Sequence, residues 1–330
     1  MSEISKIEQN LTIKKIDNQT VNISINNNEM LMAIVGQFDQ NLKHLSKLTD
    51  TNVYFRGNSI TCKGDNENLS IFCEGIKFLI NKYFLTKIIE KEDIISSVKK
   101  NFEIEESNVK SFKQLIKTPK KSVIARSKKQ SEYIKALKEN DIRMSLGPAG
   151  TGKSFLAVSV AVTLLMEKKI DRVILSRPAV EAGEKLGFLP GDMKEKVDPY
   201  LRPLYDALYE LFGADKIDKK IQTGEIEIAP LAFMRGRTLK NSFAILDEAQ
   251  NATDTQIKMF LTRIGENSKI VVNGDPSQID LPNKNMSGLD RSKKLLSHLN
   301  EISVIDFDYS DVVRHPLVSK IVKAYSNHND

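Results

Sequence analysis

The sequence predicts an α/β core with a mostly parallel sheet, preceded by a small α+β domain. Strand patterns occur at 142–146, where apolar and polar residues alternate, and at 172–176 and 243–246, which are apolar runs. A helical apolar stripe follows the glycine-rich turn after the first of them. Strands that alternate with helices in this way are typical of parallel sheets. Ahead of this region, runs of alternating apolar and polar residues are separated by amphipathic helices, which predicts the smaller domain.

The composition indicates a globular protein with a mild preference for anionic partners. The chain has 330 residues, of which 40% are hydrophobic, and its formal net charge is +6. The two cysteines, Cys62 and Cys73, lack the spacing of a zinc site or a disulfide framework, so we expect a reducing compartment. We find no leader segment and no apolar run long enough to cross a bilayer. These observations predict a soluble cytoplasmic protein without a membrane partner.

The first part of the chain predicts two hairpins and two helices. Alternating runs predict strands at 11–16, 20–25, 52–55 and 59–63, and amphipathic patterns predict helices at 30–48 and 66–84. The helix–hairpin–helix order is similar to a KH-type RNA-binding unit, although only Gly36 of the two glycines of a G-x-x-G loop is present. Gly36 also interrupts the first helix. A packing or oligomerisation role for this domain stays open.

Charge and composition divide the chain into three parts. We assign residues 1–109 to the N-terminal KH-like domain with a mixed-charge connecting helix, and residues 130–330 to the α/β core. Between them, residues 110–129 form a basic linker that is rich in lysine and arginine and has no acidic residue. The linker is interpreted either as a contact to a phosphate backbone or as a solvated connection.

A glycine-rich turn after the strand at 142–146 carries the strongest chemical signal. The turn has the pattern G-x-x-x-x-G-K-S and consists of Gly147, Pro148, Ala149, Gly150, Thr151, Gly152, Lys153 and Ser154. Glycines lack a Cβ, so backbone N–H groups can surround a phosphate chain, and the following helix adds its positive end. Lys153 is placed to reach the β- and γ-phosphates, and Ser154 to ligate Mg²⁺. The pattern predicts a site for ATP with Mg²⁺.

Two carboxylates follow the apolar run at 243–246. Asp247 is placed to hold Mg²⁺ through water, and Glu248 to orient and deprotonate an attacking water. After the next strand, Gln278 is placed to sense the γ-phosphate, while Asp275 is interpreted as organising the turn or as supporting a residue that contacts the ligand. These residues and Lys153 form the predicted catalytic set, together with an arginine considered next.

Three further residues are candidates that each have a plainer interpretation. Gln130, just upstream of the turn, is placed to hold adenine through its amide, or it is a surface residue. Arg177 follows the strand at 172–176 and is interpreted as a contact to the γ-phosphate or to nucleic acid, or as a surface charge. Arg314 is interpreted as an arginine finger, which stabilises charge on a transferred phosphoryl group, or as part of a local salt bridge.

Several segments in order resemble one family. They are R-G-N at 56–58, G-P-A-G-T-G-K-S-F-L-A-V at 147–158, S-R-P-A-V-E-A-G-E-K-L-G-F-L-P-G-D at 176–192, L-A-F-M-R-G-R-T at 231–238, L-D-E-A-Q-N at 246–251, N-G-D-P-S-Q at 273–278 and V-V-R-H-P-L-V at 312–318. Together they are similar to the PhoH-like family of phosphate-starvation-inducible ATPases. The resemblance implies a RecA-like P-loop ATPase domain, similar to the first such half of superfamily 1 helicases, with a KH-like N-terminal domain and RNA-related roles. Ser154 departs from the family pattern, in which threonine is frequent, but it keeps the hydroxyl.

The leading functional expectation is Mg²⁺-dependent ATP hydrolysis coupled to the binding or remodelling of RNA. One alternative is an RNA-associated switch or scaffold that uses ATP without unwinding. A second is a P-loop kinase for a small metabolite, against which Glu248 and Gln278 argue. Because the chain has room for only one RecA-like domain, we expect a homo-oligomeric ring, a hexamer. In that ring Arg314 or Arg177 would lie near the γ-phosphate of a neighbour.

Overall fold

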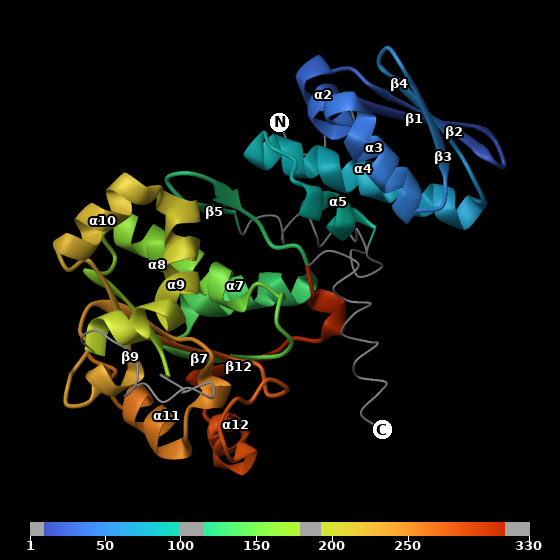
Figure 1. Ribbon diagram of the computed structural model, residues 1–330. Helices are drawn as coiled ribbons and strands as arrows, with labels where there is room; N and C mark the ends of the chain where they lie inside the picture. The colour runs from blue at the N-terminus through green and yellow to red at the C-terminus, as the bar shows by residue number, and fades with distance from the viewer. Residues whose placement is uncertain (1–9, 99–114, 179–192, 314–330) are drawn as a thin grey trace. The chain divides into compact units, whose positions relative to one another are not determined.

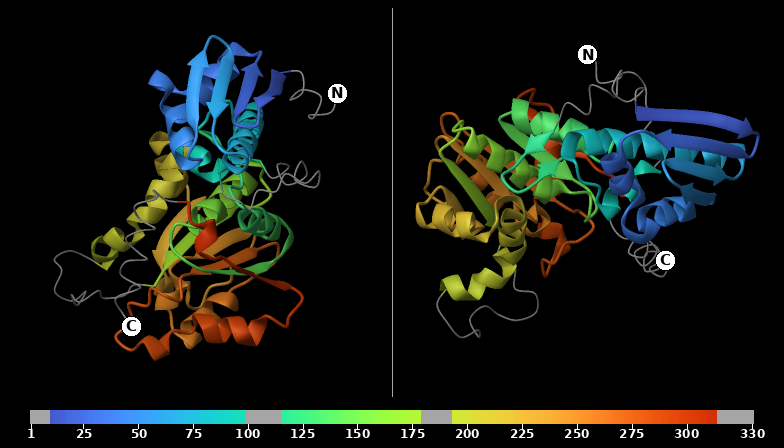
Figure 2. Two further views of the ribbon diagram at one scale, coloured as in Figure 1. Left: turned by 90° about the vertical axis from the view of Figure 1, so that its right-hand side faces the viewer. Right: turned by 90° about the horizontal axis from the view of Figure 1, so that it is seen from above.

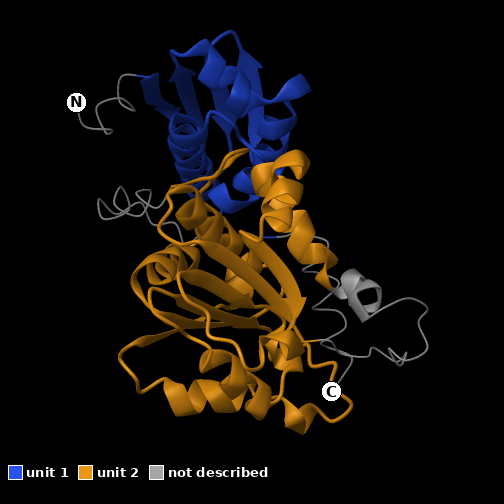
Figure 3. Cartoon of the chain, turned by 90° about the vertical axis from the view of Figure 1, so that its left-hand side faces the viewer, with its two compact units in different colours: residues 1–113, 313–330 blue, residues 114–312 orange. Residues whose placement is uncertain are grey.

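The computed structural model describes residues 10–98, 115–178 and 193–313 of the chain (Figure 1). The chain divides into two compact units, which Figure 3 shows in different colours. Unit 1 consists of Met1–Lys113 and Val313–Asp330, and unit 2 consists of Gln114–Val312. Each unit has a hydrophobic core of its own.

Unit 1 is a four-stranded antiparallel sheet with helices on one face. Its elements are β1 (Leu11–Asp17), β2 (Thr20–Ile25), α2 (Asn28–Val35), η1 (Gln37–Asp39), α3 (Gln40–Leu48), β3 (Asn52–Arg56), β4 (Ser59–Lys63), α4 (Asn66–Thr86) and α5 (Lys91–Ser97). The strand order is β1-β2-β4-β3. Helices α2, α3 and α4 lie on the same side of these strands (Figures 1 and 2). The small α+β domain predicted ahead of the core is confirmed.

Alternation of apolar and polar residues explains why this sheet has one covered face. Val21, Ile23 and Ile25 of β2 are buried in the core, whereas Asn22 and Ser24 between them are partly exposed. A shift of one residue in register would exchange the two sets, so the pattern fixes both the pairing and the covered face. Helix α4 buries its apolar side against the same core.

The helix predicted at 30–48 is divided at Gly36 into α2 and α3. Gly36 has a φ of 76°, and a Cβ there would lie 2.5 Å from the side chain of Asn41. Phe38 and Asp39 also have positive φ values, of 51° and 59°. The interruption predicted at the glycine is therefore confirmed as a tight turn, since a continuous helix cannot adopt these dihedrals.

Unit 2 contains a six-stranded parallel sheet of order β12-β7-β11-β10-β8-β9. Its strands are β7 (Ile142–Leu146), β8 (Arg172–Arg177), β9 (Ile226–Pro230), β10 (Ser242–Leu246), β11 (Lys269–Gly274) and β12 (Ile302–Asp306). A separate hairpin is formed by two short strands, β5 (Ile116–Lys117) and β6 (Ser122–Val123). Its helices are α7 (Lys128–Glu139), α8 (Lys153–Met166), α9 (Met193–Phe212), α10 (Ala214–Gln222), α11 (Asp254–Leu261) and α12 (Leu289–Leu296). Short 3-10 helices are η4 (Leu231–Met234), η5 (Ala249–Asn251), η6 (Lys284–Met286) and η7 (Tyr309–Asp311). The predicted α/β class with a mostly parallel sheet is confirmed.

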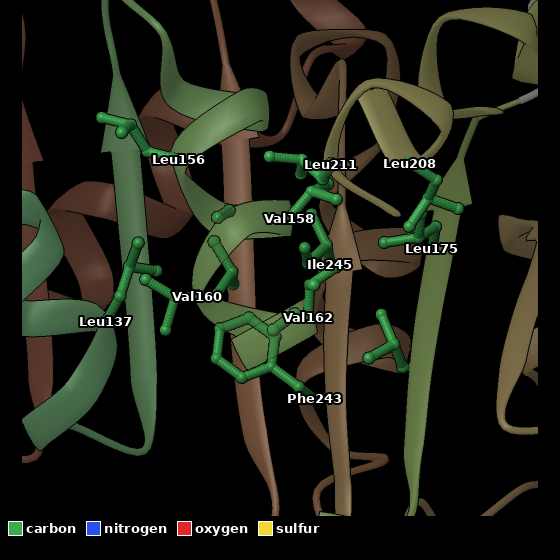
Figure 4. Close-up of a cluster of buried hydrophobic side chains, with 14 of the residues drawn as sticks. Leu137, Leu156, Val158, Val160, Val162, Leu175, Leu208, Leu211, Phe243 and Ile245 are labelled. Atoms are coloured by element: carbon green, nitrogen blue, oxygen red, sulfur yellow. The ribbon is translucent and has the colours of Figure 1, made fainter. Parts of the chain in front are cut away.

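Both faces of this sheet are covered. Helices α7 to α10 pack on one face, and α11 and α12 pack on the other (Figure 1). Val158 and Val162 of α8 lie against Ile245 and Phe243 of β10 (Figure 4). Coverage on both sides explains the continuous apolar runs in the strands, because a strand with two buried faces has no polar side.

Parts of the sequence-based organisation fall on residues that the structure does not describe. Residues 99–114, 179–192 and 314–330 lie outside the described ranges, and Arg314 is among them. The segment expected to be a basic linker, 110–129, contains the β5–β6 hairpin of unit 2. Within the described ranges, no helix is long and apolar enough to cross a membrane.

Candidate active site

The carboxyl ends of four neighbouring strands bring most of the predicted site residues together. β7 leads into the glycine-rich turn, β10 into Asp247 and Glu248, and β11 into Asp275, while β8 ends at Arg177. These strands lie in the order β7-β11-β10-β8 and run parallel. Their carboxyl ends therefore meet at one edge of the sheet, which is where ligands bind in sheets of this type.

The backbone of the turn has a shape that glycine alone adopts readily. Gly147 has a φ of 139°, and a Cβ there would overlap the backbone oxygen of Phe307. Gly152, with a φ of 83°, directly precedes the first residue of α8. The first N–H groups of a helix have no partner within it and carry partial positive charge, so this end of α8 suits a phosphate group.

Lys153 is held by the turn that it follows. Its ammonium donates hydrogen bonds to the carbonyl oxygens of Gly147, at 2.6 Å, and Pro148, at 2.9 Å. The residue is only 8% exposed. A buried ammonium needs such partners, and phosphate oxygens entering the turn would be stronger ones because they carry charge.

Asp247 accepts hydrogen bonds from two other side chains of the site. The Ser154 hydroxyl donates to its Oδ1, while the Arg177 guanidinium donates to its Oδ2 from Nε, at 2.9 Å, and from Nη2, at 2.5 Å. Asp247 is 2% exposed, so its charge is desolvated and depends on these donors. Ser154 and Asp247, each expected from the sequence to hold Mg²⁺, are therefore in direct contact, and Arg177 joins them.

The oxygens of Ser154 and Asp247 fit a divalent cation. Mg²⁺ prefers hard oxygen ligands and is usually held by one or two protein groups together with phosphate oxygens. A hydroxyl and a carboxylate meet at the mouth of the turn, where the phosphate oxygens would supply the rest of such a ligand set. The residues present therefore fit Mg²⁺, with Ser154 and Asp247 as its holders.

Glu248 sits at the same edge in a strained backbone conformation. Its φ of 53° and ψ of 39° are left-handed, which costs a residue with a Cβ on the order of 1–3 kcal/mol. Its side chain is 45% exposed, and Oε1 lies 3.7 Å from Nη2 of Arg177. The carboxylate is thus next to the buried Asp247 and still accessible to water.

Gln250, which the sequence analysis assigned no role, links two parts of the site. Its Nε2 donates to Glu248 Oε2 at 2.6 Å, and its Oε1 accepts from the backbone N–H of Asp275 at 2.9 Å. The carboxylate of Asp275 in turn accepts from the backbone N–H of Ala149 at 2.9 Å. A continuous chain of hydrogen bonds therefore joins the glutamate to the glycine-rich turn. The signal for Gln250 was an amide side chain two residues after the glutamate.

Gln278 and Gln130 both contact this framework. Gln278 Nε2 donates to Asp275 Oδ2 at 2.8 Å, which places the predicted sensor beside the turn. Gln130 is buried; its Nε2 donates to the carbonyl of Thr151 at 3.0 Å, and its Oε1 accepts from the N–H of Arg126 at 2.6 Å. The interpretation of Gln130 as a surface residue is wrong, because the amide braces the turn from behind. Its contact to adenine stays a prediction, as does the role of Arg314, which lies outside the described residues.

A buried polar cluster lies within the sheet behind the site. Asn273 Oδ1, at the end of β11, accepts hydrogen bonds from the Tyr133 hydroxyl and the Ser145 hydroxyl, each at 2.7 Å. Burial raises the pKa of Tyr133 well above its ordinary value, so the phenol remains a neutral donor. These bonds tie α7 to the strands that carry the turn and Asp275.

The comparison with known proteins agrees with this geometry. The family described as PhoH-like protein matches residues 122–326. A PhoH-like protein of Bacillus subtilis is 46% identical over 312 residues, which cover 94% of this chain and 98% of that protein. The chain belongs to the PhoH-like protein family. A PhoH-like relative from Synechocystis is 42% identical, with 93% of this chain and 94% of the relative covered. Protein PhoH of Escherichia coli is 43% identical over 206 residues, which cover 62% of this chain and 58% of that protein.

Solved structures that resemble this PhoH-like chain do so weakly. The Hef helicase domain of Pyrococcus furiosus gives a TM-score of 0.35 at 14% identity and covers 56% of this chain and 38% of its own. The Pif1 helicase of Candida albicans gives 0.29 at 14% identity, with 57% and 41% covered. Membership of the PhoH-like family and the glycine-rich turn identify unit 2 as a P-loop NTPase domain.

Proposed function

We propose that the chain hydrolyses ATP with Mg²⁺ and couples this reaction to the binding or remodelling of RNA. One observation carries the first half of the proposal: the Ser154 hydroxyl at the start of α8 donates to Asp247 at the end of β10. A phosphate-binding turn and a carboxylate placed for a metal ion, in direct contact, are two of the parts that P-loop NTP hydrolysis uses.

Each residue around this contact has a separate proposed role in hydrolysis. Lys153 exchanges the carbonyls of the turn for phosphate oxygens and so neutralises charge on the transferred group. Ser154 and Asp247 would hold Mg²⁺, which would supply further positive charge to the phosphoryl oxygens. Gln278 lies close enough to Asp275 to follow changes at the turn. Gln130 holds the turn from behind and is proposed to contact adenine with the same side chain.

Glu248 is the proposed base. Gln250 occupies Glu248 Oε2, so Oε1 is the oxygen left to take a proton from an attacking water. The half-exposed position of the side chain allows a water to reach it. General bases must lie within hydrogen-bond distance of the proton that they remove, and a fixed carboxylate orientation favours this.

The proposed assembly is a homo-oligomeric ring, a hexamer, that completes the site. Unit 2 contributes one turn and one pair of carboxylates. The finger would then be Arg314 or Arg177 of a neighbouring subunit, directed at the γ-phosphate.

A second candidate is an RNA-associated switch that binds ATP and hydrolyses it slowly without unwinding. The pairing of Arg177 with Asp247 favours this candidate, since a bound Mg²⁺ would compete with the guanidinium for the carboxylate. Breaking a buried charge pair is costly, which is expected of a slow cycle.

Phosphate release with and without single-stranded RNA tests the proposal. Wild type should release phosphate from ATP with Mg²⁺, and RNA should accelerate the release. Glu248→Gln should bind a fluorescent ATP analogue but lose release, whereas Glu301→Gln, on an exposed turn, should behave as wild type. Unwinding of a tailed RNA duplex by wild type separates the motor from the switch. Absence of phosphate release from wild type would overturn the proposed hydrolysis.

A further inference from the structure

The sheet of unit 1 has one face that no described helix covers. Helices α2, α3 and α4 lie on the opposite side, as the left view of Figure 2 shows most directly. In β2, Asn22 and Ser24 point to the uncovered side, and the pairing of β2 with β1 and β4 places Lys14 and Thr61 on either side of Asn22. In antiparallel sheets the residues paired across strands lie on the same face.

One row of side chains crosses this face from β1 to β3. The pairs Lys14–Asn22, Asn22–Thr61 and Thr61–Tyr54 form it, so Lys14 and Tyr54 lie three strand spacings, roughly 14 Å, apart. Tyr54 is 62% exposed. Arg56 lies two residues further along β3 and therefore projects from the same face, roughly 7 Å away along the strand.

The net charge of this face is positive. Lys14, Arg56 and Lys63 project from it and are exposed. The strands place one carboxylate on it, that of Asp17 at the end of β1, which pairs with Thr20 in the same row as Lys63. Within the described ranges, none of these three cations forms an ion pair. Asn22 Nδ2 donates to Thr61 Oγ1 at 3.2 Å, so the floor between the cations is made of hydrogen-bonded neutral groups.

The turn between α2 and α3 carries a negative charge, that of Asp39. In KH units a G-x-x-G loop at this place clamps the nucleic-acid backbone. Here Asp39 stands at the second glycine position with a left-handed φ of 59°, and Phe38 beside it is 86% exposed. The Nζ of Lys43 is directed back to the carbonyl of Phe38 at 3.1 Å. A carboxylate at this position would repel a phosphate, so this turn is a poor clamp.

We infer that the uncovered sheet face of unit 1, centred on Tyr54, binds single-stranded RNA. The inference rests on the proposed RNA-linked function and moves its contact from the α2–α3 turn to the sheet. Tyr54 offers a ring on which a base stacks, and Lys14, Arg56 and Lys63 offer charges to the phosphates around it. Aromatic side chains on a flat, positively charged sheet are a recurring way of holding single-stranded RNA.

The test is anisotropy of a labelled oligouridylate titrated with the full chain at several salt concentrations. Tyr54→Ala should weaken binding by about 5- to 150-fold, the range that corresponds to the loss of one stacked base, while Tyr54→Phe should keep it. The double variant Lys14→Gln/Arg56→Gln should lower the slope of log affinity against log salt by about 1.4, since each contact to a single strand contributes about 0.7.

A matched pair of charges on the other side of unit 1 provides the control. Lys43→Gln/Lys47→Gln removes two exposed charges from α3 and should leave affinity and salt slope close to those of wild type. Thermal unfolding of each variant shows that it is folded. If wild type binds and the α3 pair, rather than the sheet variants, lowers the affinity, the sheet assignment is wrong while the RNA function stands. If wild type fails to bind the oligonucleotide, both fall.

Discussion

The guanidinium of Arg177 lies against the carboxylate of Asp247, with Nε 2.9 Å and Nη2 2.5 Å from Oδ2. The same carboxylate accepts the Ser154 hydroxyl on Oδ1. Arg177 therefore supplies positive charge to the side chain that we assign to Mg²⁺. A bound Mg²⁺ would place a second positive charge beside the same carboxylate, so the pairing of Arg177 with Asp247 should weaken when the metal binds.

The first prediction follows from this competition. Arg177→Gln removes the competing charge, so the Mg²⁺ concentration needed for tight binding of a fluorescent ADP should fall by about tenfold, the worth of one charge-assisted hydrogen bond. Turnover should fall as well if the released arginine acts on a phosphate. Arg172→Gln, at the opposite end of β8, is the matched control and should change neither property. An unchanged Mg²⁺ requirement in Arg177→Gln would mean that the pair does not oppose the metal.

The second prediction concerns Gln250. Gln250→Ala removes the bridge between Glu248 Oε2 and the N–H of Asp275, so the base loses its fixed orientation while the turn remains intact. We expect kcat to fall about tenfold or more with little change in nucleotide affinity, as for other loss of catalytic positioning. Gln222→Ala, at the exposed end of α10, should match wild type in both. Steady-state kinetics measure kcat, and equilibrium binding measures nucleotide affinity. Equal losses in both would show that the amide has a structural role rather than a role in orienting Glu248.

Some residues of the site could be predicted from their position after a strand, and others could not. Ser154, Asp247 and Glu248 were predictable because a glycine-rich turn and an acidic pair each follow an apolar run, and the ends of parallel strands meet. The bridge made by Gln250 was not, since it depends on the rotamer of one amide and on the position of the next strand. The sequence likewise places Arg177 at the end of a strand, but it does not show that Asp247 is the partner of its guanidinium.

The fold likewise has features that the sequence predicts and features that depend on tertiary contacts. The parallel sheet follows from apolar runs alternating with helices, and the break at Gly36 follows from glycine within a helical pattern. The sequence could not tell that Gln130 is buried, because a glutamine in the first turn of a helix is ordinarily exposed. Its burial results from the tertiary contact between α7 and the turn, which no local pattern encodes.

The third prediction tests completion of the site by a neighbour. If Arg314 of another subunit acts as the finger, turnover per subunit should rise steeply with protein concentration as the ring assembles. Arg314→Ala should lower turnover by about 10³-fold while ATP binding persists, since a finger acts on the transition state. Phosphate release across a dilution series, alongside molecular mass from light scattering, provides the measurement. Turnover that is independent of concentration in a monomer would exclude a finger in trans.

The fourth prediction concerns pH. Burial raises the pKa of the Cys62 thiol from 9.0 to about 11, with a smaller opposing effect from its hydrogen bond to Thr51. The unfolded chain therefore loses this proton first, so the contribution of Cys62 to stability is complete below pH 9.0 and is lost as the pH rises toward about 11. The difference in unfolding free energy between wild type and Cys62→Ala should shrink across that window in urea titrations. A difference that is constant with pH would show that the buried thiol does not titrate as described.

The fifth prediction separates two costs of replacing a glycine. Gly147→Ala must accept both a φ of 139° and an overlap with the backbone oxygen of Phe307, whereas Gly224→Ala must accept only a φ of 75°, with no other atom within 4 Å of the new Cβ. We expect Gly224→Ala to lower the unfolding free energy by about 1 kcal/mol, and Gly147→Ala by roughly 2–4 kcal/mol.

Binding of a fluorescent ATP analogue completes this comparison. Gly147→Ala should lose binding, because relief of the overlap moves the turn away from the Lys153 ammonium and from the start of α8. Gly224→Ala leaves that region untouched and should bind as wild type does. Similar losses of stability in the two variants, with nucleotide binding retained in both, would show that the close approach to Phe307 does not hold the turn in shape.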